Sequence, residues 1–202
     1  MPKKVFFTLD EDRKQELIDS SYNVFSKNQC SKLSINDITK ELNITRTAFY
    51  YYFYNKEDLY SYLVELIKDK FLSEYIYDKE QKYDLDDIFI QLFNFLSSLK
   101  DTKYQNFLFD LFYNISFTRQ NKLLTKLFKG TDVPYSHFTG FDKYNMKSFD
   151  EVKEITIIIF EITFHQLIDY YEGDLTIEES VERLKRKIYL INYGIKKGEL
   201  NE

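Results

Sequence analysis

The segment 34–59, SINDITKELNITRTAFYYYFYNKEDL, contains three helix-start signals in close succession. Ser34 is followed three residues later by an acid, which is the capping-box pattern, and Thr45 and Asn55 precede the next two helical stretches. Asn43 stands between the first two helices, where its tolerance of the left-handed backbone conformation suits a tight turn. Starts this close together leave room only for two short helices before a longer one. The spacing therefore predicts a helix-turn-helix.

The rest of the chain is also predicted to be helical, because apolar residues recur at helical spacing and Thr, Ser or Asp caps the starts. The predicted helices span residues 8–28, 34–42, 45–52, 55–77, 84–99, 102–116, 118–129, 148–171 and 176 to about 194–197. Thr8 is the predicted cap of the first helix. The segment 130–147 contains two Gly and a Pro and no clear period, so it is predicted to be a loop. No strand is expected.

The fold class that follows is all-α, in two parts. An N-terminal three-helix helix-turn-helix domain is expected over residues 1–54. The long fourth helix, residues 55–77, connects it to a helical bundle, and residues 55–202 form this second domain.

Charge is unevenly distributed along the 202 residues. The net charge is −5, which argues against a general nucleic-acid binder. Residues 1–60 carry nine basic and nine acidic side chains, so the net negative charge lies wholly in residues 61–202. Within 26–56, five basic residues face only two acidic ones. A locally basic stretch on an acidic body is consistent with one end that faces DNA.

The helix 45–52 has two chemically different sides. At 100° per residue, Phe49 falls on the side of Phe53, while Thr47 and Tyr51 fall nearly opposite. A helix this short cannot bury both sides, so the second side is expected to be exposed, with Arg46 at its margin. Hydroxyl, phenol and guanidinium groups can contact base edges and phosphates. Ala48, the only alanine of the chain, indicates a place where bulk is not tolerated, either against the scaffold or at the DNA.

These residues resemble the N-terminal domain of TetR-family regulators. The resemblance covers residues 8–60 and runs without a gap from Ser34-Ile35-x-Asp37-Ile38 through Asn43-Ile44-Thr45 to Phe49-Tyr50-x-Tyr52-Phe53-x-x-Lys56-Glu57-x-Leu59. Members of that family are two-domain, all-helical homodimers with a DNA-binding head and a variable effector-binding body. Asn43 departs from the usual Gly, and Thr47 stands where Gly or Ala is common.

The resemblance implies roles for individual residues. The implied phosphate contacts come from Ser34, Thr45, Tyr50, Tyr52 and Lys56. The implied base contacts come from Arg46, Thr47 and Tyr51, and the departure at Thr47 bears on which operator is preferred.

The last helix has an apolar seam of coiled-coil type. Its members follow one another at intervals of four and three residues: Ile177, Val181, Leu184, Ile188, Ile191 and Ile195. We expect a homodimer through the helices at about 148–172 and 176–196, with two helices from each subunit forming a four-helix interface. The alternative is a seam within one chain.

Any effector pocket would be lined mostly by aromatic residues between 84 and 172. The candidates are Phe109, Phe112, Tyr113, Phe117, Phe164 and His165. The alternative for each is ordinary core packing, and for His165 a core histidine whose hydrogen bonds are satisfied.

Other classes of protein are disfavoured. Two histidines and one cysteine give no metal-ligand spacing, no Gly-rich phosphate loop exists, and no nucleophile stands beside a base, so neither a cofactor nor catalysis is expected. Neither a membrane span nor a secretion signal is found, so the expected location is the cytoplasm.

The function predicted from the sequence is a ligand-responsive transcriptional regulator. We expect a repressor that a small molecule releases from a palindromic double-stranded DNA operator. The alternative is a protein-binding adaptor or co-activator on the same scaffold, without a small-molecule effector.

Overall fold

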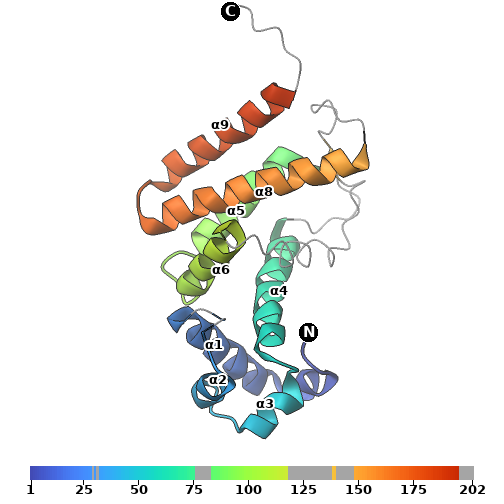
Figure 1. Ribbon diagram of the computed structural model, residues 1–202, viewed down its shortest axis with the longest axis vertical. Helices are drawn as coiled ribbons and strands as arrows, with labels where there is room; N and C mark the ends of the chain where they lie inside the picture. Colours follow the sequence, from blue (N-terminus) through green and yellow to red (C-terminus); the bar gives the residue numbers. More distant parts are fainter. Residues whose placement is uncertain (29, 31, 76–82, 118–137, 140–147, 196–202) are drawn as a thin grey trace, which may run out of the picture. The chain divides into compact units, whose positions relative to one another are not determined.

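The computed structural model describes residues 1–28, 30, 32–75, 83–117, 138–139 and 148–195 (Figure 1). These residues group into two compact units. The first comprises Met1–Leu72 and Asp101–Leu111, and the second Ser73–Lys100 and Phe112–Glu202. The predicted helix 118–129 lies outside the described residues, as does all of the predicted loop except 138–139. The all-α fold class is confirmed.

The first unit holds the predicted short helices at the predicted places. Its elements are η1 (Lys4–Thr8), α1 (Glu11–Lys27), α2 (Ile35–Glu41), α3 (Arg46–Tyr52) and most of α4 (Lys56–Tyr75). The Ser34 side chain caps α2 in a complete capping box with Asp37. Between α2 and α3, Asn43 has a φ of 50°, in the left-handed region. The helix-turn-helix is therefore present.

The first helix begins later than the sequence predicted. Asp10, not Thr8, caps α1, and its carboxylate accepts a hydrogen bond of 2.8 Å from the Arg13 backbone N–H. The Thr8 hydroxyl instead donates to the Val5 carbonyl within η1. Both side chains are good caps, and the 3₁₀ turn that precedes Asp10 decides between them.

The core of the first unit is rich in aromatic and aliphatic side chains. Its members are each at most 2% exposed to solvent: Phe6, Leu17, Tyr22, Phe25, Ile38, Leu42, Phe49, Phe53, Leu59, Leu63 and Phe107. They come from η1, from each of α1 to α4, and from α6 (Gln105–Phe117), whose first residues belong to this unit. This shared core fixes α3 against its neighbours.

The second unit is a layered packing of long helices. Helix α8 (Phe149–Glu172) packs on both α5 (Leu85–Ser98) and α9 (Ile177–Ile195), as Figure 1 shows. Gly173 ends α8 with a φ of 88°, at the predicted break. The absence of strands was a wrong prediction, because β1 (Tyr83–Asp84) and β2 (Phe138–Thr139) form a two-residue parallel pair.

The central part of the apolar seam of α9 lies within the chain. Leu184 is 0% exposed and Ile188 is 3% exposed, since α9 packs against α5 and α8. A side chain without accessible surface in one subunit cannot contact a second. The prediction that this seam faces a partner is therefore wrong for its two central residues, and the alternative of a seam within one chain holds there.

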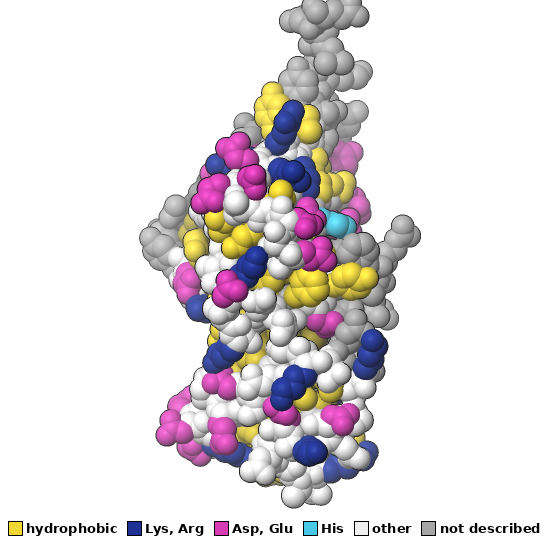
Figure 2. Space-filling view, turned by 90° about the vertical axis from the view of Figure 1, so that its left-hand side faces the viewer, with side chains coloured by type: hydrophobic (Ala, Val, Ile, Leu, Met, Phe, Trp, Pro, Cys, Tyr) yellow, Lys and Arg dark blue, Asp and Glu magenta, His cyan; other side chains and the backbone are white. Residues whose placement is uncertain are grey.

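Polar contacts also hold the second unit together. The Lys187 ammonium donates a 2.7 Å hydrogen bond to the amide oxygen of Gln166, which joins α9 to α8. Asn192 donates a 2.7 Å hydrogen bond to the Asp86 carboxylate, which joins α9 to α5. On the face seen in Figure 2, acidic, basic and apolar side chains are interspersed over this unit.

Candidate nucleic-acid interface

Helix α3 is anchored by two phenylalanines one turn apart. Phe49 and Phe53 are 0% and 1% exposed, and their ring centroids lie 5.4 Å apart. The Phe6 ring of η1 packs 5.1 Å from that of Phe53. Because one side of this seven-residue helix is held in the core, the opposite side faces solvent.

The three predicted base-contacting residues all lie on exposed positions of α3. Arg46 and Thr47 are exposed, and Tyr51 is 60% exposed. Tyrosine side chains are on average partly buried, so a ring this exposed lies on a side of the helix that nothing else in the unit covers. The arrangement places a guanidinium, a hydroxyl and a phenol on the solvent-facing side of one short helix.

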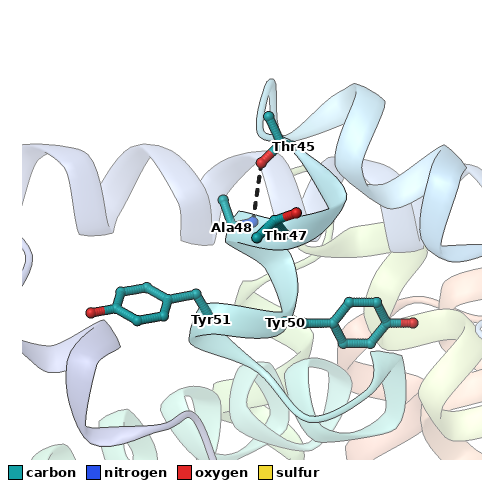
Figure 3. Close-up of a pocket in the computed structure, with 5 residues that line it drawn as sticks. All are labelled: Thr45, Thr47, Ala48, Tyr50 and Tyr51. Carbon is teal, nitrogen blue, oxygen red and sulfur yellow. Dashed lines mark hydrogen bonds between the residues drawn. The ribbon is translucent and has the colours of Figure 1, made fainter.

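An open hollow lies on this side of α3. It is lined by Thr45, Thr47, Ala48, Tyr50 and Tyr51. Figure 3 shows the two tyrosine rings pointing away from each other, with Thr47 and Ala48 between them toward the start of the helix. Ala48 borders this hollow and is half-buried.

Arg46 is partly held by its neighbours. Its guanidinium carbon lies 5.7 Å from the centre of the Tyr50 ring, within the range of a cation–π contact. One guanidinium nitrogen lies 3.4 Å from the Asn36 side-chain oxygen of α2. Both contacts are long and exposed, so the side chain remains able to exchange them for a base edge.

The two cap residues differ in what they can still donate. The Thr45 oxygen accepts a 3.1 Å hydrogen bond from the Ala48 N–H, which leaves its own proton available to a phosphate. The Ser34 hydroxyl donates a 2.7 Å hydrogen bond to the Asp37 carboxylate. This hydrogen bond, followed by one from the Ser34 backbone, lowers the pKa of Asp37. A phosphate contact from Ser34 would have to compete with that carboxylate.

The other three predicted phosphate contacts differ in their surroundings. The Lys56 ammonium donates a 2.7 Å hydrogen bond to the Leu33 carbonyl, directly before the cap of α2. Tyr50 is 38% exposed. Tyr52 is half-buried, and its ring lies 6.1 Å from that of Phe6. The phenol of Tyr50 is therefore more open to a phosphate than that of Tyr52.

Lys3 is a residue of this surface that sequence reasoning missed. Its backbone N–H donates 2.8 Å to the Tyr52 carbonyl, and its ammonium donates 2.6 Å to the Tyr50 carbonyl. Lys3 thereby satisfies two carbonyls at the end of α3 that lack partners within the helix. The only hint in the sequence is that two lysines precede the Phe6–Phe7 pair.

The predicted effector residues are only partly brought together. Phe112 and Phe164 are 0% and 3% exposed, with ring centroids 5.1 Å apart. Phe109 belongs to the first compact unit rather than the second. Of Phe117, the structure describes only its place as the last residue of α6.

Two of the effector candidates face solvent instead. Tyr113 is 43% exposed. His165 is exposed as well, and its Nδ1 lies 3.0 Å from the Glu161 carbonyl of the preceding turn. The alternative interpretation of His165 as a core histidine is therefore wrong, because its side chain is exposed to solvent.

Neither a metal cluster nor a membrane span is found in the described part of the chain. Within it, His, Cys, Asp and Glu side chains form no group of three that could hold a metal ion. None of its helices combines the length and apolar character needed to cross a bilayer.

Comparison with protein families matches both parts of the chain. Residues 17–63, which contain α2 and α3, match the model described as bacterial regulatory proteins, tetR family. Residues 84–195, more than half of the chain, match the tetracyclin repressor-like C-terminal domain. The chain belongs to the TetR family. It is therefore a DNA-binding transcriptional regulator, and the predicted resemblance is confirmed.

Individual TetR-family relatives are more distant. The negative regulator IcaR of the biofilm operon icaADBC from Staphylococcus epidermidis is 29% identical over 83 residues, which cover 41% of this chain and only 45% of that protein. IcaR from Staphylococcus aureus strain Newman is 22% identical over 193 residues, covering 91% of this chain and all of that protein.

A solved structure shares the fold. The regulator FadR from Bacillus subtilis, in complex with stearoyl-CoA, superposes with a TM-score of 0.58 over 90% of this chain and 99% of its own. Its sequence identity is 18%, so the likeness concerns the fold alone.

Proposed function

We propose that this TetR-family chain is a ligand-responsive repressor that binds a palindromic operator as a homodimer. The observation that carries the proposal is the two-sided character of α3, with Phe49 and Phe53 buried and the opposite side exposed. A B-DNA major groove is wide enough to admit such a helix. The name of IcaR as a negative transcriptional regulator supports repression rather than activation.

The contacts are assigned by what each side chain can still reach. Arg46, Thr47 and Tyr51 would contact base edges, because they lie on the exposed positions of α3. The side chains at the ends of the short helices and at their margin would contact phosphates: Ser34, Thr45, Tyr50, Tyr52 and Lys56. In this assignment, residues 1–54 read the DNA and residues 55–202 serve effector binding and dimerisation.

The homodimer would form through exposed apolar side chains of α8 and α9. Ile158 on α8 is 42% exposed, and Tyr189 and Leu190 on α9 are 61% and 58% exposed. These large apolar side chains favour a partner helix, in place of the buried part of the seam. A two-fold dimer fits two half-sites separated by about 34–36 Å, one turn of DNA.

A small molecule would act through the second unit. FadR was solved with stearoyl-CoA, which shows that this fold can hold an acyl ligand in that protein. In this chain the buried rings of Phe112, Phe164 and Tyr171 form an aromatic cluster, with Phe112 5.3 Å from Tyr171. Release requires that the ligand bind more tightly to the DNA-incompetent arrangement of the dimer, not merely that it bind.

The decisive experiment is the selection of bound duplexes from a random pool. A palindromic consensus with half-sites one turn apart is the expected result, and recovery of no consensus would contradict the proposal. The selected duplex is then titrated with stearoyl-CoA as a first probe, and loss of binding would show release by an acyl ligand.

Lys56→Ala tests the phosphate assignment in the same assay. Removing one phosphate contact should weaken binding to all sequences alike and lower the slope of log affinity against log salt by about one unit per subunit. Lys103→Ala is the matched control, since it removes the same charge from a lysine that pairs with Asp19 of α1. Equal slopes for Lys56→Ala and the unmodified protein would refute the assignment.

A further inference from the structure

The hollow on α3 has an apolar floor, formed by Thr47 and Ala48, between two aromatic side chains. Ala48 contributes only its Cβ, and Thr47 contributes a methyl beside its hydroxyl. The splayed rings of Tyr50 and Tyr51 bound it on either side (Figure 3). All five lining residues come from α3 or its cap, so the hollow is formed by this helix alone.

One of the side chains that line this hollow is very small. A chain with 44% hydrophobic residues uses alanine only once, at position 48. Its backbone N–H is already taken by the Thr45 oxygen at 3.1 Å, so Ala48 offers no polar group to a ligand. The bottom of the hollow therefore suits a small apolar group.

Only one base pair edge in the major groove carries such a group. Thymine presents a C5-methyl beside its O4 acceptor, whereas adenine and guanine present polar atoms at the corresponding edge and cytosine lacks the methyl. The Thr47 hydroxyl stands at the side of the floor, where it can donate to O4. A purine placed there would set its polar edge against methyl groups, which leaves hydrogen-bonding groups without partners.

The geometry points to a thymine-methyl subsite on α3, formed by Ala48 and the methyl of Thr47, that makes these two residues determinants of operator sequence. The inference rests on the proposed function, because it requires α3 in the major groove. It goes beyond it by naming the base that the hollow accepts.

The test replaces thymines of the selected duplex one at a time with deoxyuridine, which removes only the methyl. One thymine in each half-site should show a loss of affinity of about fourfold, the effect of removing one buried methyl-sized group. If no deoxyuridine position lowers affinity, the subsite does not exist, while the proposed function still stands. If no duplex is selected at all, both are overturned.

Two variants of Thr47 test whether its side-chain methyl contacts the thymine methyl. Thr47→Ser removes the side-chain methyl and should reduce the penalty for deoxyuridine at that position. Thr47→Val keeps a methyl and loses the hydroxyl, so it should retain the penalty. The opposite ranking of these two variants would overturn the inference.

Filling the hollow should abolish the preference for thymine over deoxyuridine. Ala48→Val adds bulk where the thymine methyl would sit, so the variant should bind the deoxyuridine duplex at least as tightly as the thymine duplex. Because the two duplexes are compared on the same protein, any effect of valine on the helix itself cancels. An unchanged fourfold preference for thymine would place the methyl elsewhere.

Discussion

Arg46 is the exposed cation best placed to read a base. Its guanidinium is held only by long contacts to Asn36 and to the Tyr50 ring. We expect Arg46→Ala to reduce discrimination at one base pair of each half-site by about 1–3 kcal/mol. Arg46→Lys should lose most of the same discrimination, because lysine keeps the charge without the planar fork. Competition binding with single-base variants at fixed salt measures both. A uniform loss for all sequences would instead indicate a phosphate contact.

Asp37 provides a pH-dependent test of the α2 cap. Hydrogen bonds from the Ser34 hydroxyl and backbone N–H hold its pKa below the ordinary value of 3.8. The folded state therefore prefers the carboxylate, and the stabilisation is present above pH 3.8 and lost as the pH falls through the lowered pKa. We expect Ser34→Ala to raise the pKa of Asp37 toward its ordinary value, as followed by carboxyl-carbon NMR titration. An unchanged titration would mean that the backbone N–H alone holds the carboxylate.

Side chains that cap their own helix could be predicted from the sequence, because cap and helix are neighbours in the chain. Ser34 and Thr45 were placed correctly for this reason. Thr8 was not, since Asp10 competes for the same role and the formation of the 3₁₀ turn that ends at Thr8 depends on tertiary packing. The exposure of His165 could not be read from its apolar neighbours, because only the packing of α8 fixes which side is covered.

Helix α3 depends on a segment that lies far away in the sequence. Lys3 caps its C-terminal carbonyls with both a backbone and a side-chain donor, and its ammonium also lies 4.5 Å from the centre of the Tyr54 ring. A contact across 47 positions leaves no periodic or local signal. The start and length of α3 could therefore be predicted, whereas the brace at its end could not.

Lys3→Met tests whether this brace positions α3. Losing the ammonium from the end of a short helix should cost about 1 kcal/mol locally, which would show as faster amide exchange at the last residues of α3 and weaker operator binding. Lys4→Met is the control, as an exposed neighbour with the same charge. If Lys3→Met lowered the salt slope without changing amide exchange, Lys3 would be a phosphate contact rather than a positioning residue.

For the whole molecule, the apolar seam of α9 shows what periodicity can and cannot predict. The spacing of its members correctly indicated which side of the helix is apolar. It could not indicate what covers that side, and Leu184 and Ile188 turn out to pack within the chain against α5 and α8. Tyr189 and Leu190, which lie outside the seam, are exposed.

Two leucines of α9 therefore separate folding from association. Leu184 is 0% exposed, so Leu184→Ala should lower the free energy of unfolding by about 2–5 kcal/mol through the cavity it leaves. Leu190 is 58% exposed, so Leu190→Ala should leave the folded subunit intact and weaken the dimer. Denaturant unfolding at low concentration measures the first effect, and sedimentation equilibrium the second. Since a repressor with two half-sites gains affinity from both heads, Leu190→Ala should also weaken operator binding at concentrations below its dimer dissociation constant. A dimer of unchanged strength in Leu190→Ala would place the subunit contact on another surface.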